Sequence, residues 1–361
     1  MIATLQPGLL TTVQDEGRWG YQAYGMPVAG AMDRYAYRVA NLLVGNKPGA
    51  AGLEMTLRGG TFRFEAEALV AICGADMGAE LNGQPVAAWS SFQAPPGSVL
   101  SFGFAAAGCR TYIAVRGGID VPLVLGSRST YIRGGVGGLN GRALKAGDVL
   151  PVGGETAAPA RPQRLDPRFI PQYGGAANGA IELRVLLGPQ DDCFTAQGLA
   201  TLFGSTYTIS PDADRMGYRL DGPVIEHSGK PDIVSDALCQ GAIQVPGHGM
   251  PIIMMADRQT TGGYTKIGTV IGPDLTKLAQ AKPGDNVVFK KCSDEEAVEA
   301  LRRERQIYAE IAQSLNPAAA KEYPEYSPAA PPLAARLETA RRVFTVKVNG
   351  EIFHVEIEEE R

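Results

Sequence analysis

The chain has 361 residues, enough for two or three domains of ordinary size. Hydrophobic residues make up 45% of it and charged residues 20%, a balance that excludes a wholly disordered chain. The net charge of −4 lacks the basic excess that binds phosphate backbones, so nucleic acid is not expected as a partner. No apolar stretch is long enough for a membrane helix, and the N-terminus lacks the basic start of a signal peptide. Five scattered cysteines without a CxxC pair predict reduced thiols and a cytoplasmic protein.

Short segments bounded by glycine or proline predict a mainly-β first block, residues 1–155. Its strands are expected at Thr61–Glu65, Ala68–Cys73, Gly97–Phe104 and Arg110–Arg116. One early helix, Ala31–Val44, has apolar residues at helical spacing and ends at a Gly-Asn pair. The stretch 156–180, rich in Ala, Pro, Gly and Gln, predicts a linker or a long crossing loop.

The second block, residues 181–291, repeats this style. Its strands are expected at Ile181–Leu187, Tyr207–Ser210, Ala242–Val245, Pro251–Ala256 and Asn286–Phe289, with helices at Asp191–Phe203 and Asp274–Gln280. Both blocks end with a Gly-Asp turn that leads into a strand, LKAGDVL in the first and AKPGDNVV in the second. We therefore expect two domains of similar plan, although Gly-Asp before a strand is also common turn chemistry.

The final part, residues 292–361, differs from both blocks. Ser293 and Glu296 have the spacing of a capping box at the start of a charged helix that reaches Leu315. A Pro/Ala-rich tether follows, and Arg342–Glu359 then alternates apolar and polar residues around an Asn-Gly pair. This pattern predicts a β-hairpin.

The densest polar segment is Gly241–Ile271, where an expected strand leads into a glycine-rich loop. Asp257 there is a candidate general base or cation clamp, and Gln259 and Thr260 could bind an amide or a carboxylate. Glycines allow close approach of the backbone to an anion. Further candidate binding residues in this segment are Gln244, Thr261, Gly262, Gly263 and Tyr264. The alternative is a polar barrel rim with self-satisfied hydrogen bonds.

Three further clusters could bind ligands. Gln14 and Asp15 lie among glycines near Arg18, where Asp15 and Arg18 could instead form a structural ion pair. Arg142 belongs to a segment with three more arginines and eight glycines, and Arg215 lies in the sequence DRMG; each is a candidate anion ligand, or part of an ordinary turn. No GxxxxGK[ST] motif is present, and three scattered histidines predict no metal site.

Several of these motifs, taken in order, resemble one family. They are PGLLTTVQDEGRWGYQAYGMPVAGAMD, NLLVGN, VRGGID, GSRST, GGLNGR, DRMGYRL, GAIQVPGHGMPII and DRQTTGGY, and they extend over about residues 1–289. The chain resembles the biotin-dependent carboxyltransferase family, also called allophanate hydrolase subunit 2. That family includes the C subunit of bacterial 5-oxoprolinase, the KipA antagonist, and half of the carboxyltransferase domain of urea carboxylase.

The resemblance implies two cyclophilin-like β-barrel domains and a cyclophilin-like, KipI-type B subunit as partner. It implies a subunit of an enzyme that acts on a small amide substrate, most directly ATP-dependent opening of 5-oxoproline to glutamate with a lactam-utilisation A subunit. One alternative is carboxyl transfer to urea from carboxybiotin on a separate carrier protein. Another is a non-catalytic antagonist that binds a KipI-type kinase inhibitor. ATP is expected to bind the complex at a site that the motifs do not locate.

Within that reading, Asp257 and Gln259 would act on the amide. Hydrogen-bond donors for developing negative charge would come from Thr260, Gly262 and Gly263. Arg215 and Arg142 would clamp an anion, and the opposite wall would be shaped by Gln14 and Asp15. Replacing Asp257 by alanine is expected to abolish turnover and leave the fold intact.

The C-terminal segment FTVKVNGEIFHVEIEE resembles the lead-in to biotinyl carrier domains, but no Met-Lys-Met biotinylation site follows it. The hairpin could recruit a separate carrier, be the remnant of a gene fusion, or add to the edge of a sheet.

Overall fold

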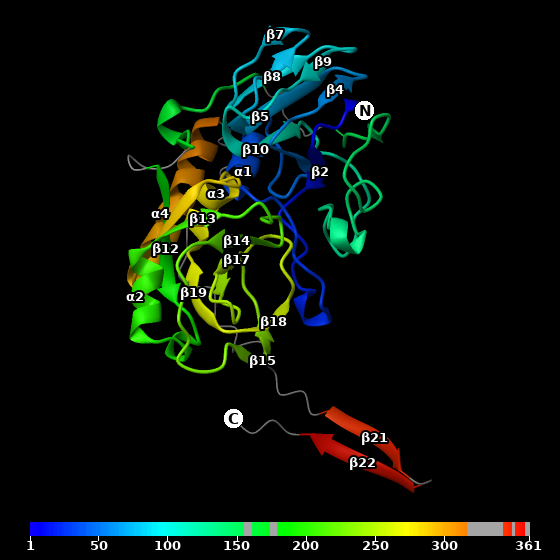
Figure 1. Cartoon of the computed structure of the whole chain (residues 1–361). Helices are drawn as coiled ribbons and strands as arrows, with labels where there is room; N and C mark the ends of the chain where they lie inside the picture. Colours follow the sequence, from blue (N-terminus) through cyan, green and yellow to red (C-terminus); the bar gives the residue numbers. More distant parts are fainter. Residues whose placement is uncertain (155–160, 174–178, 316–341, 349–350, 358–361) are drawn as a thin grey trace. The chain divides into compact units, whose positions relative to one another are not determined.

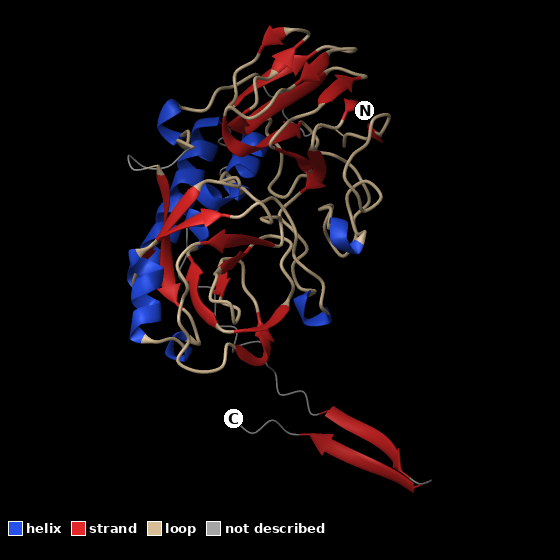
Figure 2. Cartoon of the chain, in the orientation of Figure 1, coloured by secondary structure: helices blue, strands red, loops and turns tan. Residues whose placement is uncertain are grey.

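The computed structural model describes residues 1–154, 161–173, 179–315, 342–348 and 351–357 (Figure 1). The chain divides into two units, Met1–Tyr323 and Pro324–Arg361. Strands dominate the first unit and a few helices accompany them (Figure 2). The expectation of a mainly-β fold with short helices is confirmed. Among the described residues, no helix is both long enough and apolar enough to cross a lipid bilayer.

The first block consists of two antiparallel sheets that enclose one core. The six-stranded sheet has the order β11 (Val149–Leu150), β1 (Ile2–Gln6), β4 (Thr61–Phe64), β9 (Val99–Ser101), β6 (Glu80–Leu81) and β7 (Gln84–Pro85). The five-stranded sheet has the order β2 (Leu10–Gln14), β3 (Gly52–Thr56), β10 (Ala107–Val115), β5 (Ala68–Asp76) and β8 (Ser90–Ala94). In the described chain no ladder of hydrogen bonds joins the two sheets, and residues of both sheets contribute to the single core between them.

The long apolar strand β5 shows how this sheet is buried on both faces. Val70 and Ile72 point into the core between the two sheets. Leu69 and Ala71, the alternate residues, pack in a second cluster under the helices α1 (Arg34–Leu43) and α4 (Asp294–Leu315). Successive side chains of a strand point to opposite faces, so a strand buried on both sides becomes continuously apolar.

The second block closes into a seven-stranded barrel, as expected. Its order is β12 (Ala180–Leu187), β19 (Lys266–Val270), β16 (Ala242–Gln244), β17 (Ile252–Met254), β14 (Gly217–Asp221), β13 (Thr206–Ile209) and β20 (Asn286–Lys291). Only β12 and β20 pair in parallel. The barrel also carries α2 (Ala196–Gly204), α3 (Gly272–Ala279) and a two-stranded ribbon of β15 (Asp232–Ala237) and β18 (Thr261–Tyr264).

The helix expected over Asp191–Phe203 is interrupted. A short 3-10 helix, Asp191–Cys193, comes first, and α2 begins only after Thr195, whose hydroxyl accepts a hydrogen bond from the Gly198 N–H. An N-cap residue has extended backbone, so a helix cannot run through it.

The Gly-Asp turns that end the two blocks have the same chemistry. Asp148 accepts a hydrogen bond from the Lys145 N–H at 2.7 Å, and Asp285 accepts one from the Lys282 N–H at 3.0 Å. Each aspartate thereby fixes the turn that feeds β11 or β20.

Two polypeptide segments tie the blocks together. In the first block, Met32 precedes α1, yet its side chain belongs to the core of the second-block barrel. Gln280, at the end of α3, donates to Asp33 Oδ2 at 2.7 Å and to the Arg110 carbonyl at 2.9 Å, and its Oε1 accepts from the Arg110 N–H at 2.9 Å. Asp33 in turn caps α1 by accepting from the Ala36 N–H. The blocks therefore share core and hydrogen bonds.

The crossing segment is packed where the structure describes it. Over 161–173, Leu165 is buried and its N–H donates to the Trp89 carbonyl at 2.9 Å. Tyr35 on α1 donates to the Phe169 carbonyl at 2.6 Å. The boundaries of the two domains stay a prediction.

The C-terminal part agrees with its pattern. Ser293 and Glu296 form the expected capping box, with the Glu296 N–H donating to Ser293 Oγ at 3.2 Å and the Ser293 N–H donating to Glu296 Oε2 at 2.9 Å. The second unit contains the expected hairpin of β21 (Arg342–Val348) and β22 (Glu351–Ile357). The expected Pro/Ala tether lies outside the described residues.

Candidate functional site

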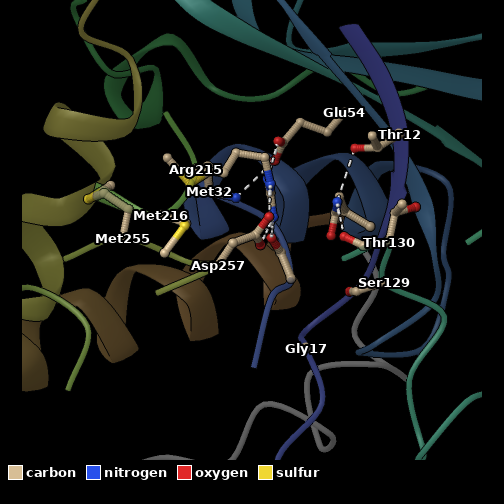
Figure 3. A network of polar contacts seen from close by, with 12 residues as sticks. Thr12, Gly17, Met32, Glu54, Ser129, Thr130, Arg215, Met216, Met255 and Asp257 are labelled. Carbon is tan, nitrogen blue, oxygen red and sulfur yellow. Dashed lines mark hydrogen bonds and ion pairs between the residues drawn. The ribbon is translucent and has the colours of Figure 1, made fainter. Parts of the chain in front are cut away.

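A buried ion network lies where the two blocks meet. Arg215, in the turn before β14, donates to both carboxylate oxygens of Asp257: Nε to Oδ2 at 3.0 Å and Nη2 to Oδ1 at 2.8 Å (Figure 3). Its Nη1 donates to Glu54 on β3, and Nη2 also donates to the Gly30 carbonyl at 2.7 Å. Arg215, Asp257 and Glu54 are all more than nine-tenths buried. Buried charges of this kind need partners, and here the partners come from both blocks.

The two carboxyl groups of the network respond differently to burial. Burial raises the pKa of Asp257, and the attraction of Arg215 offsets only part of that rise. Burial also acts to raise the pKa of Glu54, but Arg215, Arg110 and two hydrogen-bond donors outweigh it and hold that pKa below its ordinary value. Glu54 is therefore a fixed negative charge, whereas Asp257 has the raised proton affinity that suits an acid–base group.

Asp15, at the end of β2, fixes the loop 127–130. Its Oδ1 accepts from the Gly17 N–H at 2.8 Å and from the Ser127 hydroxyl at 2.7 Å, and the Ser129 hydroxyl binds the same atom. The predicted alternative, an ion pair between Asp15 and Arg18, does not form. Arg18 instead donates to the carbonyls of Val124, at 3.1 Å, and Ser129, at 2.6 Å. The carboxylate of Asp15 thus uses its hydrogen bonds to hold this loop in place.

Two polar side chains beside this loop keep one atom each without a hydrogen bond. Gln14 Nε2 donates to the Thr130 carbonyl at 3.1 Å and to Thr12 Oγ1 at 3.0 Å, but within the described chain its Oε1 has no donor. Arg18 Nη1 likewise has no acceptor there. Neither residue is exposed. Leaving such a group unsatisfied costs about 1–3 kcal/mol, so a buried unused acceptor on Gln14 and a buried unused donor on Arg18 suggest a binding role.

The charge of Asp257 acts on Arg18 and on Tyr131. Burial lowers the pKa of Arg18, and the nearby charges of Asp15 and Asp257 offset that change in part. Burial raises the pKa of Tyr131, and the Asp257 charge adds to the rise. Figure 3 draws the ion pair of Asp257 and Arg215 together with Ser129 and Thr130 of the loop that Asp15 fixes. We call Gln14, Arg18, Tyr131 and Asp257 the junction site.

The other expected residues of Gly241–Ile271 lie mostly on the ribbon. Thr261, Gly262, Gly263 and Tyr264 form β18, paired with β15, instead of a loop. Neither glycine has a positive φ, so they lie on an extended strand, and their part in binding an anion stays a prediction. Gly262 is small for packing reasons, because a Cβ there would lie 2.7 Å from Nε2 of Gln244. Gln244 donates to the Tyr264 carbonyl at 3.3 Å and is buried under the ribbon.

The remaining predicted residues are placed as follows. Gln259 and Thr260 are half-buried, in the segment between Asp257 and β18. Arg142 pairs with Asp148, at 2.7 and 2.9 Å, beside β11, and takes no part in the network of Arg215. Their roles in binding stay a prediction.

Sequence reasoning missed Glu54 and Tyr131, and it saw Arg18 only as an ion-pair partner. Glu54 had one signal: it is a lone carboxylate inside the otherwise apolar or neutral strand GLEMT. A charge in such a strand requires a buried partner, which here is Arg215 from 161 residues further along the chain. No local sequence pattern marked Tyr131 as a site residue.

Comparison with known proteins agrees with this architecture. The family of the carboxyltransferase domain, subdomains A and B, matches residues 24–291. The chain belongs to this family. The expectation drawn from the motifs is thus confirmed.

Two groups of relatives are found. The chain is 37% identical over 320 residues to the C subunit of 5-oxoprolinase from Escherichia coli, covering 88% of this chain and 99% of that one. It is 36% identical over 304 residues to urea amidolyase of Saccharomyces cerevisiae, covering 80% of this chain but 16% of that one. The first match extends over nearly the whole relative, and the second over one segment of a much longer protein.

Solved structures show the same fold. The urea amidolyase of K. lactis has a TM-score of 0.80 at 32% identity, with 85% of this chain and 20% of that chain covered. TTHA0988 has a TM-score of 0.71 at 34% identity, with 80% and 55% covered. This chain spans only a part of each of these structures.

Proposed function

We propose that this chain is the C-type subunit of an ATP-dependent 5-oxoprolinase, active together with a KipI-like B subunit and a lactam-utilisation A subunit. One observation carries this proposal: the relative matched over 99% of its length is the C subunit of a 5-oxoprolinase. Relatives in the urea group are matched over a small part of their length. We place the protein in the cytoplasm, in keeping with its free cysteines.

The junction site offers chemistry that suits a lactam. Arg18 Nη1 is a free donor for an amide carbonyl, and Gln14 Oε1 is a free acceptor for an amide N–H. Asp257, with its raised pKa, is the acid–base candidate beside them. In the reaction the C–N bond of the ring breaks, water adds its hydroxyl to the acyl carbon, and a proton goes to the leaving nitrogen; ATP and a second water yield ADP and phosphate.

Both unpaired atoms are buried in the isolated chain, and both side chains bind the loop 127–141, so a movement of this loop is the proposed route for substrate to reach them. Tyr131 lies on this loop and is only partly buried. A partner subunit that binds the loop could hold it open. This explains why activity is expected only from the assembled complex.

The cofactor assignments follow from the same residues. We assign ATP to the complex and to no particular residue of this chain, because the sequence contains no GxxxxGK[ST] motif that would locate its phosphates. Carboxybiotin on a separate carrier is the alternative cofactor, and it would supply a carboxyl group. Its ureido ring also presents an amide oxygen and nitrogen, which Arg18 and Gln14 could hold.

The test is glutamate release from 5-oxoproline and ATP by the reconstituted complex. Release that stops when this chain is omitted supports the proposal. An assembled complex that releases no glutamate but transfers carboxyl groups to urea would favour the second candidate function, which rests on the structural match to urea amidolyase. An assembled complex that does neither would favour the KipA-like antagonist.

A further inference from the structure

A cavity of the first block shares no residue with the junction site. Its volume is about 530 Å³, within the range of about 300–1,000 Å³ that is typical of small-molecule sites. Its walls come from the end of β5, the hairpin of β6 and β7 and the segment 86–89. Pro171 and Tyr173 of the crossing segment complete it. The crossing segment therefore helps to enclose a space beside the first block.

The charged side chains that line this cavity are all acidic. Asp76, at the end of β5, and Glu80, on β6, line it, whereas no described lysine, arginine or histidine does so. Asp76 Oδ1 accepts a hydrogen bond from the Gly78 N–H at 2.9 Å, which lies within its own turn. Neither carboxylate forms an ion pair with any part of the described chain. The cavity thus has two acidic groups and no basic group, which favours a cation as its occupant.

A buried tryptophan adds a hydrogen-bond donor to the same cavity. Trp89 is 4% exposed and lines the cavity, yet its indole Nε1 has no hydrogen-bond acceptor among the described residues. An indole N–H that is buried usually has such a partner. This unpaired donor is independent of the two carboxylates, and it indicates that the occupant also carries an acceptor oxygen.

The position of Trp89 is fixed by its surroundings. Its φ of 59° lies in the left-handed region that bulky residues rarely adopt. Its N–H donates to the Ile72 carbonyl at 2.6 Å, and its carbonyl accepts from the Leu165 N–H at 2.9 Å. The ring centroids of Tyr35 and Tyr173 lie 6.0 and 6.3 Å from that of Trp89. The indole therefore has little freedom to turn toward another acceptor.

We propose that this cavity binds a small organic ammonium ion that carries a hydroxyl or carbonyl oxygen near its nitrogen. The ammonium group donates charge-assisted hydrogen bonds to Asp76 and Glu80, and the oxygen accepts the Trp89 indole N–H. Aromatic rings beside the carboxylates also suit a cation. The site does not depend on the proposed function, because the chain alone should bind the ammonium ion.

The two tryptophans of the chain allow a direct test. Trp19 is half-exposed, and Trp19→Phe leaves Trp89 as the only tryptophan. The fluorescence of this full-length variant is titrated at neutral pH with trans-aminocyclohexanol and, separately, with trans-cyclohexanediol, each with its two groups on neighbouring ring carbons. Sodium chloride keeps the ionic strength constant. The two probes share the ring and one hydroxyl and differ in the ammonium group.

We expect a saturable fluorescence change with the amino alcohol and none with the diol. Asp76→Asn and Glu80→Gln, made in the Trp19→Phe chain, should each raise the half-saturating concentration at least fivefold. Asp76→Asn still has an oxygen for the Gly78 N–H, so the turn is kept. The matched control is Glu67→Gln, at an exposed carboxylate outside the cavity, which should leave the half-saturating concentration unchanged.

A second measurement uses the chain with both tryptophans. The amino alcohol should raise its Tm, and this rise replaces fluorescence as the measurement if Trp19→Phe does not fold. The proposal is overturned if the amino alcohol changes neither the fluorescence nor the Tm, or if the diol binds as tightly. It is also overturned if the folded Asp76→Asn and Glu80→Gln variants both bind the amino alcohol as tightly as the parent chain.

Discussion

Arg215 holds Asp257 by two parallel hydrogen bonds, 3.0 and 2.8 Å long, and through Glu54 it connects that aspartate to the first block. The residue that the sequence marked as a base is therefore also a structural anchor. This changes the expected effect of replacing it, because a variant without the Asp257 carboxylate leaves a buried arginine with less compensation.

We predict that Asp257→Asn lowers the free energy of unfolding by about 3–5 kcal/mol, the usual effect of breaking one partner of a buried ion pair. Urea unfolding of the isolated chain measures this. The matched control is Glu65→Gln, which removes the exposed partner of Arg63 and should cost less than about 1 kcal/mol. Equal costs for the two variants would contradict the structural role of Asp257.

Gln14→Met should reduce turnover by the assembled complex at least tenfold, because it removes the free acceptor that we assign to the substrate N–H. The same change removes two buried hydrogen bonds, so folding is checked first by near-ultraviolet circular dichroism. Thr12→Val is the control, because it deletes one of those bonds and leaves Oε1 of Gln14 in place. Similar turnover in both variants would remove Gln14 from the site.

Asp33 should make stability depend on pH in a defined window. Burial raises its pKa in the folded chain to about 6, so the folded state holds a proton that the unfolded state has already released. Stability should therefore fall as pH rises from about 4 to 6, by roughly 3 kcal/mol, and stay level above that range. Unfolding by urea at several pH values measures the slope.

Asp33→Asn should remove this part of the slope, because an amide does not titrate and its oxygen can still cap α1. Asp166→Asn, at an exposed cap, should retain it. An unchanged slope in Asp33→Asn would show that another group is responsible.

Two glycines near the end of the first block allow the cost of backbone strain to be measured apart from the cost of a steric clash. Gly141 and Gly147 both have positive φ, but a Cβ on Gly141 would collide with the carbonyl of Gly135, whereas a Cβ on Gly147 would meet nothing within 4 Å. Gly147→Ala should cost about 1 kcal/mol for its backbone conformation alone. Gly141→Ala should cost clearly more, measured as the difference in urea midpoint. Equal losses of stability in the two variants would mean that the loop 127–141 can shift to accommodate the added Cβ.

Much of the fold could be predicted from local patterns. The Ser293 and Glu296 spacing, the apolar run of β5 and the alternation of β21 and β22 each determine a local element, and the structure has each of them. The helix over Asp191–Phe203 was wrong in its middle, because Thr195 prefers to cap a helix rather than continue one.

The candidate site was harder to predict, because its key contacts join residues far apart in the chain. Gln14 meets Thr130 and Arg215 meets Glu54, and no spacing in the sequence encodes either contact. The glycine pattern of the ribbon predicted a loop that the structure does not have. Gly262 and Gly263 suggested a loop for anions, but both lie on the strand β18, and Gly262 is small because Gln244 and Leu238 pack against it.

Met32 belongs by sequence to the first block and by packing to the barrel of the second. A fragment that begins after the crossing segment would thus form a barrel with an unfilled hole in its interior, next to an arginine deprived of Glu54. When the two blocks are expressed as separate polypeptides, we expect each to be insoluble alone and to become soluble only when both are mixed. Any gene rearrangement that divides the chain between its blocks would have to repair both defects at once.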